Sequence, residues 1–561
     1  MRLADYIKKD SSVLSETDRV AGLPLYVPNQ EEIMTWANDK FLLPGASWSF
    51  RPKQAEALWV IHKMNGLLAP IGVGFGKTLI SYLAQAALGV DNAIIMMPPG
   101  SLPGYKTEVE KYIKSFNRGP GRTQVVPYSV LSQPTSSRLL EDIAPDAIIC
   151  DEAHCLSDPT AARTSRFLAY MARHPDTLFV GMSGTLYRKS ITDVAHLAAL
   201  ALRSGSPVPR PGSEDLNSWS RILDTKGWAE AHEYAWFESS FVRKVGVDPG
   251  TYGKVNRARS AAYRRLVSCP GVVTTEEASC TVSLTLNKVP IEPPASVLDK
   301  IAEVKATRTS PDGEDFYEED SRLFGAMRNL ACGFYYKFDW AAVGGRNEDW
   351  IIARRAWLRA LTKELFQNKA MSYDSPKLVS AKVDSDLEAD HDLVTSSFLH
   401  FARGEWNKVK HLPEPPRVTV WVDTYLIDYV KANYLGRPEL VWYDSQAIGE
   451  GLSGAGFDVY GAGTDLTGPE RSAAASIGAH GTGRNLQDWH KAVVVEPCMS
   501  GHIWEQLLGR LHRGGQERNV TFDLLIPGDL FNNSIDSAKA DAKFIQSMSG
   551  GPQRLLTATW T

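Results

Sequence analysis

Residues 67–82 read LLAPIGVGFGKTLISY, and this stretch decides how we expect the chain to fold. A short apolar run leads into a glycine-rich loop, which Gly76-Lys77-Thr78 closes before a second apolar run begins. This order predicts a strand, a phosphate-binding loop and a helix, because backbone N–H groups aimed by a helix N-terminus hold phosphate oxygens. The glycines expected to supply the turn are Gly72, Gly74 and Gly76.

Lys77 and Thr78 carry the chemistry expected of that loop. The Lys77 ammonium should reach the β- and γ-phosphates of ATP, and the Thr78 hydroxyl should take one position on Mg²⁺. The common pattern GxxxxGK[ST] has a glycine where this chain has Ile71, so the later glycines must make the turn. A turn without a ligand is the alternative interpretation of a lone glycine-rich loop.

Composition bounds the rest of the molecule. The 561 residues are 43% hydrophobic and 22% charged, typical of a globular protein with roughly three or four domains. Because Lys+Arg number 61 against Asp+Glu 65, any nucleic-acid surface must be a local patch. Six scattered cysteines without a CxxC pair favour free thiols over zinc or disulfides. No stretch approaches the roughly 18 apolar residues of a membrane span, so we expect no membrane partner.

Apolar runs that alternate with helical patterns predict a parallel α/β sheet around the loop. The runs that we expect to be strands lie at 92–97, 124–128, 147–150 and 177–180. Ligands bind at the carboxyl ends of such strands. Asp151-Glu152 and Ser183-Gly184-Thr185 follow two of these runs directly, so one cleft can hold them together with the phosphate loop.

Asp151 and Glu152 are the candidate metal ligand and general base. A carboxylate at the end of a buried strand can hold Mg²⁺, and its neighbour is then placed to polarise the attacking water. The alternative is a solvated acidic turn. His154 is expected either to couple the site to other parts of the chain or to be a polar loop residue. Upstream, Gln54 follows Phe50-Arg51-Pro52-Lys53 at a helix start, where its amide can meet an adenine edge or simply face solvent.

The middle of the chain carries a basic segment and then a stretch without strand alternation. Residues 243–265 are rich in Lys and Arg, with interleaved tyrosines, which suits contacts to nucleic-acid phosphates; a solvated helix face is the alternative. The arginines expected to bind nucleic acid are Arg257, Arg259, Arg264 and Arg265. Residues 290–412 are predicted to form a mainly helical insertion with a Trp-rich core.

A second α/β region is predicted beyond the proline-rich turn at 412–416. Its expected strands lie at 418–422, 440–443, 457–460, 475–477, 492–495 and 520–526. Near its end, helical spacing places Gln506, Arg510 and Arg513 on one face. Two guanidinium groups one turn apart can meet the γ-phosphate of a nucleotide held by the first region.

Taken in order, these segments resemble the superfamily 2 helicases and translocases, most closely the chromatin-remodeller branch and its phage-encoded relatives. FRPKQ resembles the adenine-reading motif, GVGFGKT motif I, PPGSLPGYKTEVEK motif Ia, DEAH motif II, SGT motif III, GTGRNLQ motif V and QLLGRLHRGGQ motif VI. The resemblance covers about 46–190 and 415–530. This chain departs from the branch at Ile71, at Lys53 and at Arg484, where leucine is usual.

The resemblance implies two RecA-like lobes that hydrolyse ATP between them and track along a nucleic acid. It implies coupling roles for His154, Ser183 and Thr185, and backbone contacts to the strand by Ser101 and Thr482, with Arg484 adding a phosphate contact. The expected domains are a lead-in at 1–45, a first lobe at 46–289, the insertion at 290–412 and a second lobe at 413–561.

The expected activity is that of a nucleic-acid-stimulated ATPase with Mg²⁺ as cofactor, with DNA favoured over RNA. The alternatives are an ATP-gated clamp that displaces proteins without unwinding, and an RNA helicase. The N-terminus MRLADYIKKD has no apolar signal core, so we expect a cytoplasmic protein of a bacterium or a phage-infected host.

Overall fold

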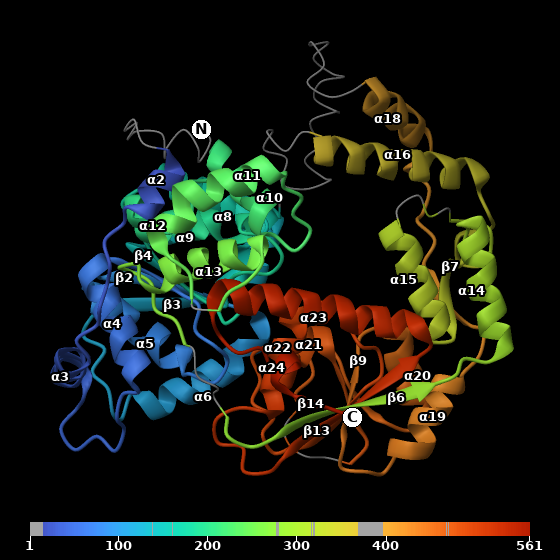
Figure 1. Cartoon of the computed structure of the whole chain (residues 1–561). Coiled ribbons are helices and arrows are strands. Elements are labelled where there is room, and N and C mark those ends of the chain that lie inside the picture. Colours follow the sequence, from blue (N-terminus) through green and yellow to red (C-terminus); the bar gives the residue numbers. More distant parts are fainter. Residues whose placement is uncertain are drawn as a thin grey trace.

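In the computed structural model, the first sheet lies in the blue to teal part of the chain (Figure 1). It has five parallel strands in the order β1-β5-β4-β2-β3. They are β1 (Gly66–Ala69), β2 (Asn92–Met97), β3 (Arg122–Pro127), β4 (Ala147–Asp151) and β5 (Leu178–Met182). Helices cover both faces, so the inner strands are continuous apolar runs, as the sequence predicted. The structure describes residues 15–561 except 137, 160, 249, 276–279, 316, 318–319, 368–396, 467 and 469–470.

Helix α5 (Lys77–Leu88) follows β1 through the glycine-rich loop. Gly76 caps its N-terminus with φ 78°, and Gly89 caps its C-terminus with φ 70°, both in the left-handed region that glycine adopts at little cost. The other helices around this sheet are α3 (Gln30–Phe41), α4 (Pro52–Met64), α6 (Leu102–Tyr112), α7 (Leu139–Ile143), α8 (Ala162–Arg173) and α9 (Thr192–Leu202).

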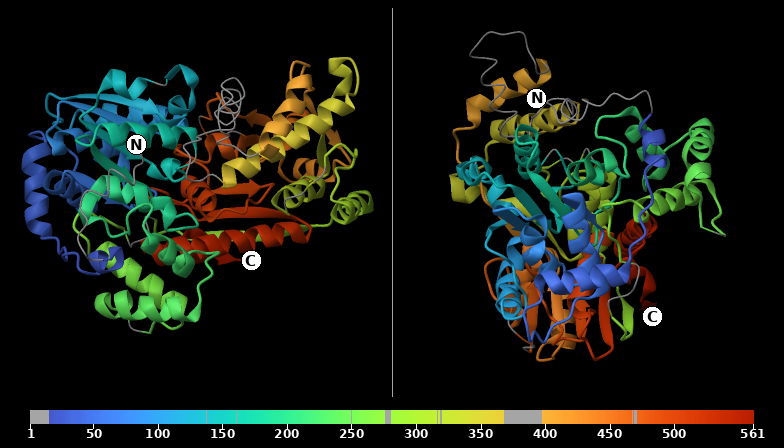
Figure 2. Two further views of the ribbon diagram at one scale, coloured as in Figure 1. Left: turned by 90° about the horizontal axis from the view of Figure 1, so that it is seen from above. Right: turned by 90° about the vertical axis from the view of Figure 1, so that its left-hand side faces the viewer.

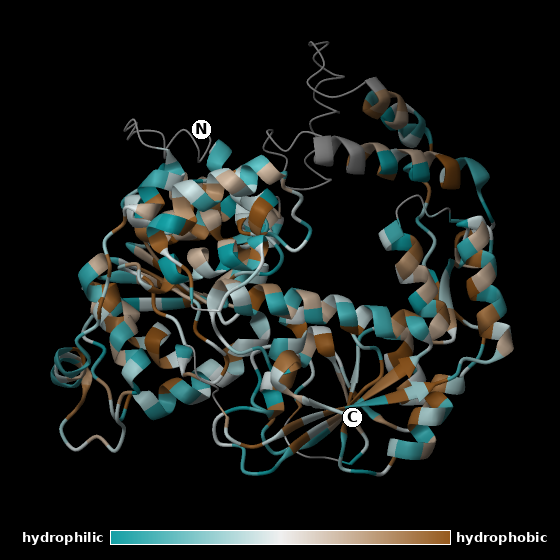
Figure 3. Cartoon of the chain, in the orientation of Figure 1, coloured by the Kyte–Doolittle hydropathy of each residue, from teal (hydrophilic) through white to brown (hydrophobic). Residues whose placement is uncertain are grey.

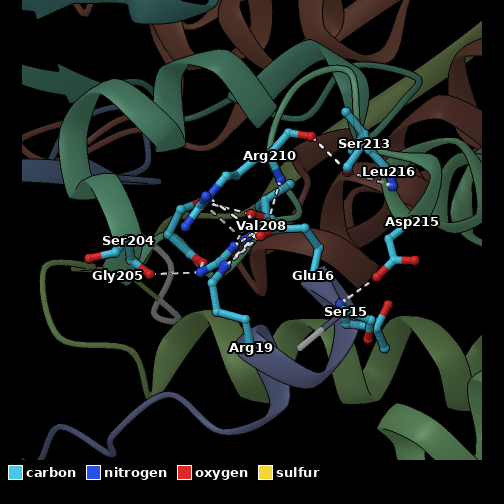
Figure 4. A network of polar contacts seen from close by, with 12 residues as sticks. Ser15, Glu16, Arg19, Ser204, Gly205, Val208, Arg210, Ser213, Asp215 and Leu216 are labelled. Atoms are coloured by element: carbon cyan, nitrogen blue, oxygen red, sulfur yellow. Dashed lines mark hydrogen bonds and ion pairs between the residues drawn. The ribbon is translucent and has the colours of Figure 1, made fainter. Parts of the chain in front are cut away.

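A helical group sits beside α9 and continues the first lobe. It comprises α10 (Glu214–Leu223), α11 (Ala231–Phe237), the π-turn η6 (Glu238–Val242), α12 (Arg243–Val245) and α13 (Lys254–Val267). The N-terminal helix α2 (Glu16–Ala21) is fixed to this group (Figure 4). The Arg19 guanidinium pairs with Glu16 at 2.8 Å and donates to the carbonyls of Ser204, Ser206 and Val208. Residues 1–14 of the expected lead-in lie outside the described residues.

The second sheet has seven parallel strands in the order β10-β11-β9-β12-β13-β6-β14. They are β6 (Leu284–Ile291), β9 (Leu440–Tyr443), β10 (Asp458–Tyr460), β11 (Ala473–Ser476), β12 (Lys491–Val494), β13 (Val520–Pro527) and β14 (Thr559–Trp560). Its helices are α19 (Tyr425–Tyr434), α20 (Gln446–Ala455), α21 (Ile477–His480), α22 (Gly501–Leu511), α23 (Asp529–Ser549) and α24 (Arg554–Thr557). Figure 3 shows the apolar strands of this sheet enclosed by helices with polar outer faces.

Strand β6 corrects the expected domain boundary. Residues up to 289 are predicted to belong to the first lobe. However, β6 pairs with β13 of the second sheet, with Leu284 opposite Val520 and Ile291 opposite Pro527. The chain therefore enters the second sheet before the insertion begins. A strand's apolar pattern indicates that it is buried, but it does not say which sheet buries it.

The insertion is attached to the second lobe on the side opposite the first lobe (yellow in the left view of Figure 2). It contains α14 (Ala295–Thr307), α15 (Asp320–Ala331), β7 (Phe334–Phe338), α16 (Glu348–Gln367), α18 (Ser397–Val409) and β8 (Arg417–Trp421). Strand β8 was expected within the second α/β sheet, but it pairs antiparallel with β7 in a separate two-stranded sheet. Part of the predicted helical insertion, 368–396, lies outside the described residues.

Helix α23 joins the two lobes. It begins in the second lobe, and its last turns pack against α13 of the first. Phe544 and Met548 of α23 are buried within the first lobe's hydrophobic core. The Arg259 guanidinium lies 5.0 Å from the centre of the Phe544 ring. The described helices include none that is long and apolar enough to cross a membrane.

Candidate active site

The phosphate loop, residues 71–76, connects β1 to α5 at the carboxyl end of the first sheet. Lys77 opens α5 and is 8% exposed, with its Nζ 3.2 Å from the Ile71 carbonyl oxygen and 3.2 Å from Glu152 Oε1. The loop after β5 approaches closely, since a Cβ on Gly184 would lie 3.2 Å from Ile71 O. Half-buried Thr78 follows in the first turn of α5.

Gln54 supports this loop from the first turn of α4. Its Nε2 donates to the Phe75 carbonyl at 3.2 Å, and its Oε1 accepts the Arg51 backbone N–H at 3.0 Å. The Arg51 guanidinium donates to Gly74 O at 2.8 Å. The side chain of Gln54 is 7% exposed, so the surface-residue alternative is wrong. Its amide lies against the loop that is expected to hold the nucleotide.

The side chains of Glu152, His154 and Ser183, which follow β4 and β5, form one hydrogen-bonded cluster. Glu152 Oε2 accepts from Ser183 Oγ at 2.9 Å and lies 3.2 Å from His154 Nδ1. His154 Nδ1 is also 2.8 Å from Ser183 Oγ, while Ser183 Oγ accepts the backbone N–H of Thr185 at 3.1 Å. Asp151, 9% exposed at the end of β4, accepts the Glu152 N–H through Oδ1 at 3.1 Å. The solvated acidic turn is therefore wrong for this pair.

Burial and charge separate the two neighbouring carboxylates. Burial and the charge of Glu152 raise the pKa of Asp151 to about 6. Burial also acts to raise the pKa of Glu152, but Lys77 and His154 outweigh it and hold this pKa below its ordinary value. Burial lowers the pKa of His154, yet Cys155 and Glu152 overcome this and raise it to about 9. Glu152 is therefore the more acidic member of the pair and loses its proton at a lower pH than Asp151 does.

Helix α22 brings the second lobe onto this cluster. The side-chain amide of Gln506 lies 3.3 Å from His154 Nε2, so His154 is in contact with both lobes. The ring of His502, one helical turn earlier, is centred 5.9 Å from the His154 ring. His154 is thus buried and in contact with both lobes, and its coupling role stays a prediction.

Arg510 and Arg513 lie near the same junction, but only Arg510 is part of helix α22. Arg510 lies on α22 and donates to Gln506 O at 3.0 Å and to Arg484 O at 2.9 Å. Burial and the charge of Arg513 lower the pKa of Arg510 to about 10. Helix α22 ends at Leu511, so Arg513 lies in the following turn, and the expected helical face shared by all three residues is wrong for it. Burial lowers the pKa of Arg513, as do the charges of Arg554 and Arg51.

The two expected backbone-contact loops also meet between the lobes. A Cβ on Gly483 would lie 2.3 Å from Ser101 Oγ, and a Cβ on Gly100 would lie 3.3 Å from Thr482 O. Ser101 and Thr482 therefore belong to one continuous interlobe edge. Arg484 pairs with Asp465 at 3.0 Å, while its carbonyl accepts from Arg510. This carbonyl links the edge to Arg510.

The basic segment does not form the expected cationic track. Arg265, 3% exposed, donates to the carbonyls of Leu23 and Pro24. The other three arginines are also engaged within the chain: Arg259 donates to Leu223 O, Arg257 pairs with Glu238, and Arg264 donates to Val247 O. These four arginines do not form one exposed surface, because the Glu238 carboxylate and backbone carbonyls accept hydrogen bonds from them, and their contact with nucleic acid stays a prediction. Arg264 alone of the four is exposed.

Two residues that contact the phosphate loop, Thr275 and Arg554, were not predicted from the sequence. Thr275 lies in the connection between the lobes, and its Oγ1 accepts the Gly72 N–H at 2.8 Å. Arg554 opens α24 near the C-terminus, and its Nη2 lies 3.5 Å from Val73 O. Both line a cavity of about 100 Å³ behind the loop. Neither belongs to a recognisable motif, so no local signal pointed to them.

The donor set fits Mg²⁺ and a nucleoside triphosphate. Mg²⁺ prefers oxygen ligands and is usually held by one or two protein groups together with substrate phosphates. Thr78 and Asp151 offer such oxygens, and Lys77 offers the matching cation for the phosphates. In the described part of the chain, no group of three or more His, Cys, Asp or Glu residues is arranged to hold a metal ion.

Comparison of this chain with protein-family models and with curated proteins gave no match.

Proposed function

We propose that the chain is a nucleic-acid-stimulated ATPase that moves along or remodels DNA, built from two RecA-like lobes. The observation that carries this proposal is the junction at His154. There the phosphate loop, the Asp151-Glu152 pair and Ser183 of the first lobe meet Gln506 of the second. A nucleotide held between two lobes allows its hydrolysis to change their separation.

Each side chain has a role that follows from its position. Lys77 binds the β- and γ-phosphates, and Glu152 accepts the proton of the attacking water. Thr78 and Asp151 would hold Mg²⁺, which when bound supplies positive charge to the phosphate oxygens. Arg510 and Arg513 bring positive charge from the second lobe toward the γ-phosphate.

The interlobe edge at Ser101 and Thr482 supports nucleic acid as the partner. Loops that hold a strand by its phosphates read no bases, which suits a motor that must move over any sequence. The Arg484 carbonyl connects this edge to Arg510, so strand binding and γ-phosphate contact are joined by one hydrogen bond. DNA is preferred over RNA here on the remodeller-like motifs alone.

DNA should stimulate the ATPase more than RNA does. The measurement is the steady-state ATPase rate with single-stranded DNA, duplex DNA, forked DNA and RNA in parallel. The double variant Ser101→Ala/Thr482→Ala should lose most of the stimulation. It should keep the basal rate, because Ser101 and Thr482 belong to other segments of the chain than Lys77 and Glu152. Stronger stimulation by RNA would assign the chain to RNA. No stimulation by any nucleic acid would contradict the proposal.

Glu152→Gln should bind Mg-ATP but hydrolyse it at least ~100-fold more slowly, the usual size of a lost general base. Glutamine keeps an oxygen that can accept from Ser183, so the cluster should persist. Binding is measured with a fluorescent ATP analogue and turnover by phosphate release. Glu141→Gln, at a surface ion pair of the same lobe, is the control and should match wild type. Loss of nucleotide binding in Glu152→Gln would make Glu152 a structural residue or a metal ligand.

A further inference from the structure

The C-terminal helix α24 places an arginine against the phosphate loop from a distant part of the sequence. Arg554 is 8% exposed, and its Nη2 lies 3.5 Å from the carbonyl oxygen of Val73, at the centre of the loop. No motif of the sequence analysis includes Arg554. The loop thus has a contact in the second lobe that is separate from Gln506, Arg510 and Arg513.

The rest of the Arg554 fork is bound to Glu505 in the middle of α22 and to His512 at its C-terminal end. Its Nη1 forms an ion pair with Glu505 Oε1, and its own backbone N–H donates to Glu505 Oε2 at 2.7 Å. Its Nε donates to the carbonyl of His512 at 2.9 Å. Glu505 is 5% exposed and precedes Gln506 directly, while His512 precedes Arg513. Arg554 therefore contacts α22 before Arg510 and also contacts the residue that directly precedes Arg513.

Packing between the loop and α22 is tight at the same point. A Cβ on Gly509 would lie 3.0 Å from Val73 Cγ1 and 3.5 Å from Arg554 Cζ. The absence of a side chain at 509 thus lets Val73 and the guanidinium lie against the helix together. Burying an ion pair costs desolvation, and an apolar pair of similar volume often stabilises a fold as well. Stability alone therefore does not explain why the charged guanidinium of Arg554 is buried at this contact.

We propose that Arg554 is a positioning residue, which holds the Val73 carbonyl of the phosphate loop at a set distance from the motif VI arginines. Its planar fork bonds Glu505, the His512 carbonyl and the Val73 carbonyl at once, a geometry that one lysine ammonium cannot reproduce. The loop is thereby held in the shape proposed to receive phosphates, beside the segment that carries Arg510 and Arg513. This inference rests on the proposed function, because it assumes that the loop binds a nucleotide.

The test compares two conservative variants in the full chain. Arg554→Lys keeps a positive charge beside Glu505 but loses the fork. The matched control is Arg19→Lys, because Arg19 also pairs with a glutamate, also donates to backbone carbonyls and has a side chain that is 13% exposed (Figure 4). Its network lies in the helical group of the first lobe. The readouts are the dissociation constant of a fluorescent ATP analogue, the KM and kcat for ATP, and the thermal unfolding midpoint.

Arg554→Lys should raise the dissociation constant and KM by about tenfold or more, the size of one lost charge-assisted hydrogen bond. Arg19→Lys should leave both unchanged, even where it lowers the unfolding midpoint as much. The double variant Arg554→Gln/Glu505→Gln removes the buried charges together and should show the same rise if the lysine variant fails to fold. Equal nucleotide affinity in wild type, the Arg554 variants and Arg19→Lys would overturn the inference.

Lys77→Ala separates this inference from the proposed function. If Lys77→Ala abolishes nucleotide binding while Arg554→Lys binds like wild type, the ATPase proposal stands and Arg554 is a structural residue. If Lys77→Ala both binds and hydrolyses ATP like wild type, the loop is not a nucleotide site. Arg554 then loses its proposed role with it.

Discussion

Lys77→Ala is expected to abolish ATP turnover, with a fall of at least ~10³-fold in kcat, the upper range for one lost charge-stabilising donor. Lys77 is the cation at the N-terminus of α5, and its Nζ already lies 3.2 Å from the Glu152 carboxylate. Alanine removes the charge at the phosphates and the partner that keeps the Glu152 pKa low. The measurement is phosphate release with saturating Mg-ATP.

The fold should survive this substitution. Glu152 keeps its contacts to His154 and Ser183, so the carboxylate is not left alone in the interior. Lys111→Ala is the control, because Lys111 is an exposed lysine of α6 in the same lobe. A folded far-UV spectrum together with near-normal turnover in Lys77→Ala would refute the nucleotide assignment of the loop.

The strands and the core of the site were predictable because their signals are local. Apolar runs such as 92–97 and 147–150 are strands with helices on both faces, and all of their residues except half-buried Asn92 are buried. The carboxyl ends of parallel strands meet at one edge, so the spacing alone predicted that Asp151 and Ser183 would lie near the phosphate loop. The hydrogen bond that Ser183 donates to Glu152 follows from that topology.

The partners of buried cations were not predictable, because they come from distant segments. Arg265 is bound by the carbonyls of Leu23 and Pro24, and Arg554 by Glu505 and His512. A run of arginines has the same composition whether it faces phosphates or backbone carbonyls. The prediction that β6 belongs to the first lobe was wrong for a similar reason. The residues of β6 fit either sheet, and only their pairing with β13 assigns them to the second.

Arg513→Ala should slow ATP hydrolysis by ~10³-fold or more, the size expected for an arginine finger. Arg513 lies just beyond α22, and its nearest charged neighbours include Arg51 and Glu108 of the first lobe. It therefore brings positive charge across the interlobe junction toward the phosphate loop. Nucleic-acid affinity should change little, because the expected strand contacts lie at Ser101 and Thr482.

Arg518→Ala provides the matched control for this variant. Arg518 follows in the same segment but is exposed, and its guanidinium donates to the carbonyl of Asp488 within the second lobe. It should keep wild-type hydrolysis, so a defect confined to Arg513→Ala reports on the junction rather than on the segment. Single-turnover hydrolysis and DNA binding are measured side by side. Loss of DNA binding with an intact basal ATPase in Arg513→Ala would show that this turn faces the strand instead of the nucleotide.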